Sequence, residues 1–211
     1  MSIDKIRATI LKAGSEVPST GPDYVERISR IRRWMLDLAE EMIPIHVAVN
    51  EHGMDINGGV IERAVGAARY MLAENYEGGR DEVRGALNVL ATGVAEAFHF
   101  EEVSRYSPSY SASRAALQSI HSAVSATGDF DIFSLAAKAS LVAEESALAI
   151  AYRALADEDD VAPSGAQVAK ALSNARKDVG MAFLDGLHCR IYDDISGPLD
   201  LQSRGLPAAA M

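Results

Sequence analysis

Two short motifs in this chain of 211 residues have the spacing of metal ligands. Glu96 and His99 are three residues apart, as are Asp185 and His188, and this spacing brings a carboxylate and an imidazole to one face of a helix. Four-helix dimetal proteins use two Glu-x-x-His motifs and one further Glu from each of two other helices. The further carboxylates, which precede the two motifs in a suitable order, are Glu41 and either Glu144 or Glu145.

Helical periodicity argues against such a metal site. At about 100° per residue, Glu96 and His99 lie roughly 200° and 140° from the apolar stripe that includes Val94. Asp185 and His188 also point away from the apolar stripe of their helix, whereas a metal in the core of a bundle needs inward ligands. We therefore expect solvated side chains here, with no metal and no cofactor, and a ferritin-like metalloprotein is the alternative.

The remaining reactive residue types lack the neighbours that catalysis needs. Cys189 and His188 are adjacent, and adjacent side chains do not face each other on a helix. No serine has a general base at a recognisable spacing. The glycine pairs 58–59 and 78–79 lack the preceding strand of a phosphate-binding loop. These observations favour a non-enzymatic protein with no catalytic residues.

Charge indicates what kind of partner the protein has. Thirty acidic and twenty basic residues give a net charge of −10, which repels nucleic acid and favours a cationic protein. Residues 34–62 hold six acidic and no basic residues, so we expect this surface to be exposed and unneutralised. The acidic residues that we predict to contact the partner are Asp37, Glu40, Glu41, Asp157, Glu158, Asp159 and Asp160.

The sequence also predicts the cellular compartment of the protein. No apolar run approaches the ~20 residues of a membrane span, and the first residues lack the apolar stretch of a signal peptide. A single cysteine, Cys189, suits a reducing compartment. We therefore expect a cytoplasmic protein with no membrane partner, either a monomer or a homodimer.

Composition and the positions of proline and glycine predict an all-α fold. Alanine is abundant and aromatic residues are only 6%, which favours helices over strands. Proline and glycine clusters divide the chain into about seven helices, in one domain over residues 1–195 with an irregular tail at 196–211. We expect a bundle or an orthogonal array, with helices at about 3–13, 22–49, 59–75, 80–103, 109–126, 130–156 and 163–195.

Two of these helices carry further expectations. Helix 22–49 has an apolar seam at period 3.5, which favours the buried stripe of a bundle helix; a dimer seam in an accessory or regulatory protein is the alternative. Its Pro44 should kink it. Helix 130–156 is apolar on nearly all sides, so we expect it to be the most buried helix and expect Leu141→Asp to unfold the protein. The seam residues are Tyr24, Ile28, Ile31, Met35, Leu38, Met42, Ile45 and Val49.

One segment resembles a known family. Trp34-Met-Leu-Asp37-Leu-Ala39-Glu40-Glu41-Met-Ile-Pro44-Ile45 is similar to the opening helix of all-helical immunity proteins from bacterial polymorphic-toxin systems. The stretch from Ile61 to Tyr70 resembles their second helix, so the resemblance covers about residues 30–75. It departs from the family at Leu38, often cysteine there, and at Glu41, where a basic residue is usual. The resemblance implies a cytoplasmic protein that neutralises a cognate toxin, often a basic nuclease, by binding it.

Overall fold

The computed structural model describes residues 3–50, 58–74, 83–89, 91–92, 107–156 and 165–196. Of these residues 93% are helical and none lies in a strand, which confirms the all-α prediction. None of their helices is long and apolar enough to cross a bilayer. The predicted domain limit at residue 195 stays a prediction, because the tail lies outside the described ranges.

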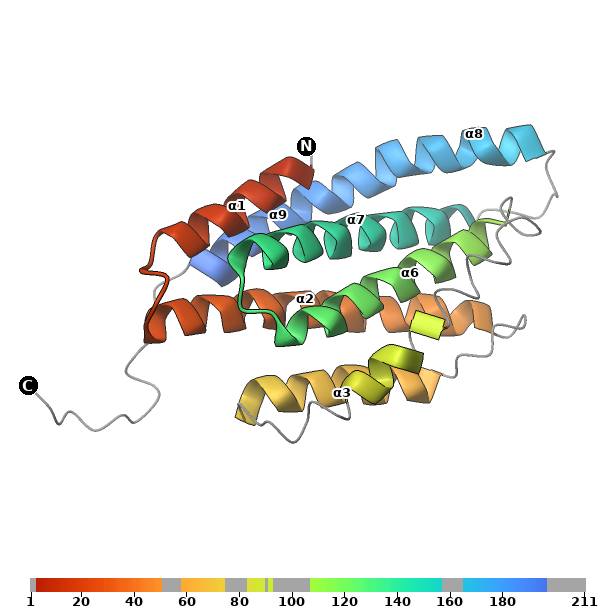
Figure 1. Ribbon diagram of the computed structural model, residues 1–211. Helices are drawn as coiled ribbons and strands as arrows, with labels where there is room; N and C mark the ends of the chain where they lie inside the picture. The colour runs from red at the N-terminus through yellow and green to blue at the C-terminus, as the bar shows by residue number, and fades with distance from the viewer. Residues whose placement is uncertain are drawn as a thin grey trace, which may run out of the picture.

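The helices begin and end close to the predicted boundaries. They are α1 (Ile3–Ser15), α2 (Pro22–Asn50), α3 (Gly58–Glu74), α6 (Pro108–Ser125), α7 (Ile132–Ala156), α8 (Gly165–Ala175) and α9 (Met181–Ser196), with the short turns η1 (Ala126–Gly128) and η2 (Arg176–Gly180). Residues 83–89 and 91–92 are also helical; the rest of the predicted helix 80–103 lies outside the described residues. In Figure 1, α6 and α7 run above α2, while α3 lies along its lower side.

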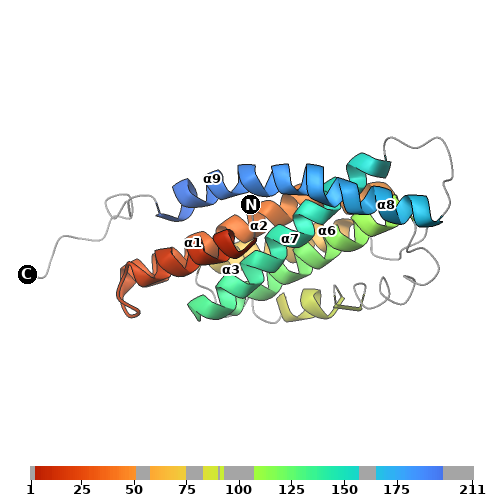
Figure 2. The same ribbon diagram turned by 90° about the horizontal axis from the view of Figure 1, so that it is seen from above.

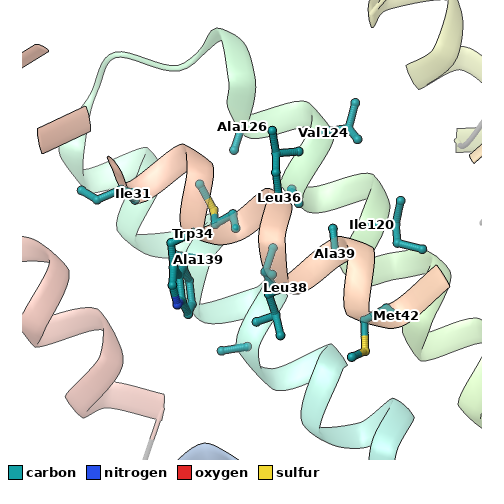
Figure 3. Packing of buried hydrophobic residues seen from close by; sticks show 14 of the residues in the cluster. Ile31, Trp34, Leu36, Leu38, Ala39, Met42, Ile120, Val124, Ala126 and Ala139 are labelled. Carbon is teal, nitrogen blue, oxygen red and sulfur yellow. The ribbon is translucent and has the colours of Figure 1, made fainter. Parts of the chain in front are cut away.

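Helix α2 occupies the centre of the bundle. The seam is buried at Ile28, Ile31, Met35, Leu38 and Met42, and half-buried at Tyr24 and Ile45. Trp34, Leu36 and Ala39 are buried as well, and Figure 3 shows these side chains among residues of α6 and α7. The seven seam side chains that the structure describes are therefore covered within this chain, which argues against the seam as a dimer surface; the side chain of Val49 lies outside the described ones. The helix continues through the exposed Pro44 to Asn50.

Small residues allow α6 and α7 to pack closely. Ser119 of α6 and Ser146 of α7 are buried, with their hydroxyl oxygens 2.8 Å apart. Eleven of the 18 residues of α6 are buried, against ten of the 25 in α7, so the expectation that helix 130–156 is the most buried was wrong. Helix α6 lies between α2 and α7, and many of its covered positions are serines, which a hydropathy pattern assigns to solvent. Leu141 is only half-buried, so it is a poor site for the predicted unfolding substitution.

Helices α8 and α9 form one continuous rod, interrupted by the π-helical turn η2 (Figure 2). A π-turn holds one residue more than an α-turn and shifts the faces of the helix that follows it. The sequence pattern predicts one buried stripe along Val168, Leu172, Ala175, Val179 and Phe183. This prediction is wrong at Val179, which is 36% exposed. From the end of the turn onward, the buried positions are Gly180, Leu184, Leu187, Ile191 and Ile195.

Candidate functional site: the surface of α2 and α3

The three acidic residues predicted on α2 reach solvent. The side chains of Asp37, Glu40 and Glu41 are 56%, 46% and 44% exposed. They lie beside α3 on one side and α9 on the other, because each makes a contact with one of these helices. The second predicted cluster, residues 157–160, lies outside the described residues.

These acidic residues are neutralised, contrary to expectation. Arg69 of α3 donates from Nη2 to Asp37 Oδ1 and from Nε to Glu40 Oε1, each at 2.5 Å. Arg190 of α9 donates from Nη2 to Glu41 Oε1 at 3.2 Å. A count along residues 34–62 misses both cations, because they come from helices that are distant in sequence and adjacent in space.

Arg69 therefore acts as a clamp between two helices. Asp37 and Glu40 are three residues apart and share one side of α2, so a single guanidinium reaches both carboxylates. The hydrogen bond to Glu40 raises the pKa of Arg69 most; burial opposes the rise and Asp37 adds to it. Exposed ion pairs each contribute only about 0.2–1 kcal/mol. The simplest role of this cluster is to hold α3 in place on α2.

A groove lies on the outer side of α3, where this helix approaches residues 83–89. It has a volume of about 660 Å³, and its floor is made of small residues, including Gly66, Ala67 and Gly85. Tyr70 and Val89 line the groove and are 52% and 45% exposed. Among the described residues that line it, Arg63 is the one with a charge.

Neither Tyr70 nor Val89 was singled out from the sequence. The position of Tyr70 on a helical projection predicts that its side chain is exposed. Tyr70 follows the buried Ile61 by nine residues. Nine residues at about 100° each place the two side chains on opposite sides of α3. A large aromatic residue opposite the buried face of an amphipathic helix is exposed, and exposed aromatic residues are unusual enough to mark a binding surface.

The proposed metal ligands do not come together in the described ranges. Asp185 is exposed, and His188 is half-buried with Nε2 3.4 Å from Thr9 Oγ1 of α1. Glu41 and Glu144 each pair with an arginine. No cluster of three or more potential ligands exists within these ranges. Glu96 and His99 lie outside them, so their predicted exposure stays a prediction.

The four arginines at the start of α2, which the sequence predicts to form a solvated, salt-bridged surface, divide into two pairs; they are Arg27, Arg30, Arg32 and Arg33. Arg30 and Arg33 pair with Glu26 at 3.3 Å and 3.0 Å, as expected for a salt-bridged surface. Arg27 and Arg32 are only 7% and 5% exposed, so the expectation of a solvated surface was wrong for these two. Arg27 donates to the backbone carbonyl of Ile195 at the end of α9, and the Arg32 guanidinium lies over the Phe130 ring.

One histidine lies in the core of the bundle. His46 has no exposed surface, and its Nδ1 lies 2.8 Å from the hydroxyl of Ser113 in α6. Ser113 is fully buried too, so the contact joins α2 to α6 inside the bundle. Because solvent reaches neither side chain, a histidine and a serine that resemble a catalytic pair are a packing contact here.

No protein-family model, curated protein or solved structure matches this chain. Within the described ranges, the surface of α2 and α3 combines an exposed aromatic residue, a groove of small residues and a cluster of ion-paired side chains.

Proposed function

We propose that this protein is a non-enzymatic binding protein of the immunity type, which neutralises a protein toxin by binding it in the cytoplasm. The binding surface is the α2–α3 face, defined as Asp37, Glu40, Glu41, Arg69 and the groove with Tyr70 and Val89. The observation that carries the proposal is the exposure of Tyr70 beside an open groove that is lined by small residues.

This face has the composition of a protein interface. Protein interfaces have an apolar centre with aromatic residues and a polar rim, and tyrosine is enriched among the residues that contribute most to binding. Tyr70 and Val89 supply the apolar centre, and the groove has room for side chains of a partner. Arg69 and its two carboxylates lie on the same helix pair and supply polar groups in fixed positions.

The resemblance to immunity proteins supports the same face. Its two segments lie in α2 and α3, and the ion pairs of Arg69 join them. Trp34, which also belongs to the resemblance, is 4% exposed and packs in the core. It therefore serves the fold, and the exposed residues of these two helices are the ones that can meet a partner.

The ion pairs change the electrostatic argument. Because Arg69 and Arg190 neutralise the three acids locally, these acids do not create a strong negative field by themselves. The net charge of −10 still attracts a basic partner over long distances. At close range, fixed charges set the orientation of a partner more than the affinity.

The test uses the product of the gene that adjoins the gene of this protein, because the immunity function requires that this neighbour encode the toxin. We expect the purified chain to bind this toxin and to restore growth of cells that express it. Tyr70→Ala and Val89→Asp should each weaken binding at least about tenfold, as interface anchors do. The matched control is Val179→Asp, which puts the same charge on an exposed valine of η2, away from this face.

Circular dichroism of each variant must show an unchanged helix content. Equal binding by the wild type, Tyr70→Ala and Val89→Asp would remove the α2–α3 face from the proposal. An adjoining gene whose product neither binds the chain nor is toxic would refute the immunity function itself.

A further inference from the structure

A second unusual surface lies at the opposite edge of the molecule, where α7 begins. Phe130 and Phe133 are 59% and 66% exposed. Val25 of α2 is also exposed, at 43%. Large apolar side chains that gather in the open on one part of a small protein mark a surface that something else covers.

A groove of about 540 Å³ adjoins these residues, between the end of α1 and the starts of α2 and α7. Its apolar lining consists of Leu11, Val17, Tyr24, Ile132 and Phe133, and Lys12 is the one charged residue that the described part of the chain contributes to it. Tyr24 also fixes the adjoining turn, because its hydroxyl donates to the Phe130 carbonyl at 3.1 Å. We name these residues together with Phe130 the aromatic groove.

Helix α9 ends at the same end of the bundle as this groove (Figure 1). Arg27 donates to the carbonyl of Ile195, in the last turn of α9. Arg27 follows Tyr24 by three residues on α2, which is less than one helical turn, or about 5 Å along the axis. Figure 1 shows the end of α9, the end of α1 and the start of α2 at the same end of the bundle.

We propose that residues 197–211 dock in the aromatic groove of the same chain, with Leu199 and Leu201 as the side chains that fill it. Leu199 follows Ile195 by four residues, which span up to about 13 Å when extended. Leu199 and Leu201 project to the same side of an extended segment. Asp200, between the two leucines in the sequence, would form an ion pair with Lys12 at the rim of the groove.

The tail matches this groove in composition. Its first residues after α9 are Gly197 and Pro198, which prevent the helix from continuing and redirect the chain. The leucines that follow are apolar without being part of any predicted helix. The end of α9 at the same end of the bundle, an apolar groove and a leucine pair at alternate positions together favour docking within one chain over docking on a neighbour. This inference does not depend on the proposed toxin partner.

The first test is disulfide cross-linking of the full chain, with Cys189→Ser to remove the native thiol. We expect Phe133→Cys with Leu201→Cys to form an intrachain disulfide under mild oxidation at least about tenfold faster than Val179→Cys with Leu201→Cys. Val179 is exposed on η2 and offers the same tail cysteine a target away from the groove. Equal rates for the two pairs would overturn the proposal, and so would a fast link that forms only between chains.

The second test changes the tail alone. Leu199→Asp with Leu201→Asp should raise hydrogen exchange at the amides of residues 129–135 and increase binding of an apolar dye by several-fold. The charge-matched control is Ser196→Asp with Gln202→Asp, which adds the same two charges next to the leucines and should change neither signal. No change in the leucine variant, or the same change in the control, would show that the leucines do not cover the groove.

Discussion

Gly14 of α1 packs directly against Ile132 of α7. A Cβ atom at Gly14 would lie 2.4 Å from Cγ1 and 2.7 Å from Cδ1 of Ile132, which is closer than any real contact between carbon atoms. The two helices therefore approach each other at a point where only glycine fits. The same contact forms the base of the aromatic groove, since both residues line it.

Substitution of Gly14 should lower the free energy of unfolding. We expect Gly14→Ala to destabilise the protein by roughly 1–3 kcal/mol, because overpacking forces neighbouring side chains or helices to move. Thermal or urea unfolding measures the loss. The matched control is Gly186→Ala in α9, where an added Cβ meets nothing within 4 Å. That variant should be unchanged or gain about 0.5–1 kcal/mol from helix propensity.

A double-mutant cycle locates the clash. In the Gly14→Ala background, Ile132→Ala should cost much less than it does in the wild type, because it makes room for the new methyl group. Strictly additive free energies of unfolding would mean that the loss arises elsewhere.

The two buried arginines of α2 should respond differently to the same substitution. Arg27 donates to the Ile195 carbonyl, and its Nε alone lacks a hydrogen-bond partner in the described part of the chain, whereas both Nε and Nη2 of Arg32 lack one there. The Arg32 guanidinium carbon lies 4.2 Å from the centre of the Phe130 ring. Burial lowers the pKa of Arg32 to about 10, although Asp129 acts in the opposite direction. The buried charge of Arg32 therefore lowers the free energy of unfolding.

Methionine keeps most of the side-chain length and removes the charge. Arg27→Met should lose about 1.5–3 kcal/mol, the contribution of a hydrogen bond from a charged donor. Arg32→Met should leave the free energy of unfolding unchanged or raise it by about 1–2 kcal/mol, because burial of an unsatisfied charge is unfavourable. Urea unfolding of both variants is the measurement, and equal losses would contradict this distinction.

The buried contact between His46 and Ser113 gives another stability test. Ser113→Ala should cost about 1–2 kcal/mol, because it removes a partner of a fully buried imidazole nitrogen. Ser15→Ala at the exposed end of α1 is the control, since its hydroxyl bonds only to the local carbonyl of Lys12, and it should change the stability by less than about 0.5 kcal/mol. Equal effects of the two substitutions would show that the buried contact contributes nothing.

The sequence predicted the helices and the central seam because local periodicity determines both. It could not predict features that depend on contacts between distant helices. Asp37 looked unneutralised because Arg69 lies 32 residues away. Val179 was assigned to the wrong face because a π-turn has no recognisable local pattern.

The position of a residue in the sequence also failed to predict the N-cap of α7 and the burial of Arg32. Asp129 directly precedes the predicted helix 130–156 and is therefore the cap that the sequence predicts, but Ser134 N donates to Asp131 Oδ2 at 2.8 Å. Asp129 instead binds Lys138 Nζ at 2.6 Å. The two candidate caps differ by only two residues, so the choice depends on how the preceding turn is fixed by its neighbours. The burial of Arg32 likewise follows from Phe130, which lies almost one hundred residues away in the chain.

Glu145 of α7 predicts a pH dependence of stability. Burial raises the pKa of Glu145 above its ordinary value of 4.5; Arg114 and Arg176 oppose the rise and Glu144 adds to it. A raised pKa means that the folded state binds the proton more tightly than the unfolded state. This group therefore costs no stability below about pH 4.5, and its cost grows as the pH rises through the interval between 4.5 and the raised pKa.

Glu145→Gln removes this charge and should reveal the cost. We expect the variant to be more stable than the wild type at pH 7, and the difference to shrink as the pH falls toward 4. Urea unfolding of both proteins at pH 7, 5.5 and 4 gives the three differences. Glu144→Gln is the control on the same helix, because Glu144 is exposed and pairs with Arg176 at 3.1 Å. Its loss of an exposed ion pair should lower the stability by about 0.2–1 kcal/mol at pH 7. A gain for Glu145→Gln that does not change with pH would assign the effect to packing and not to the buried charge.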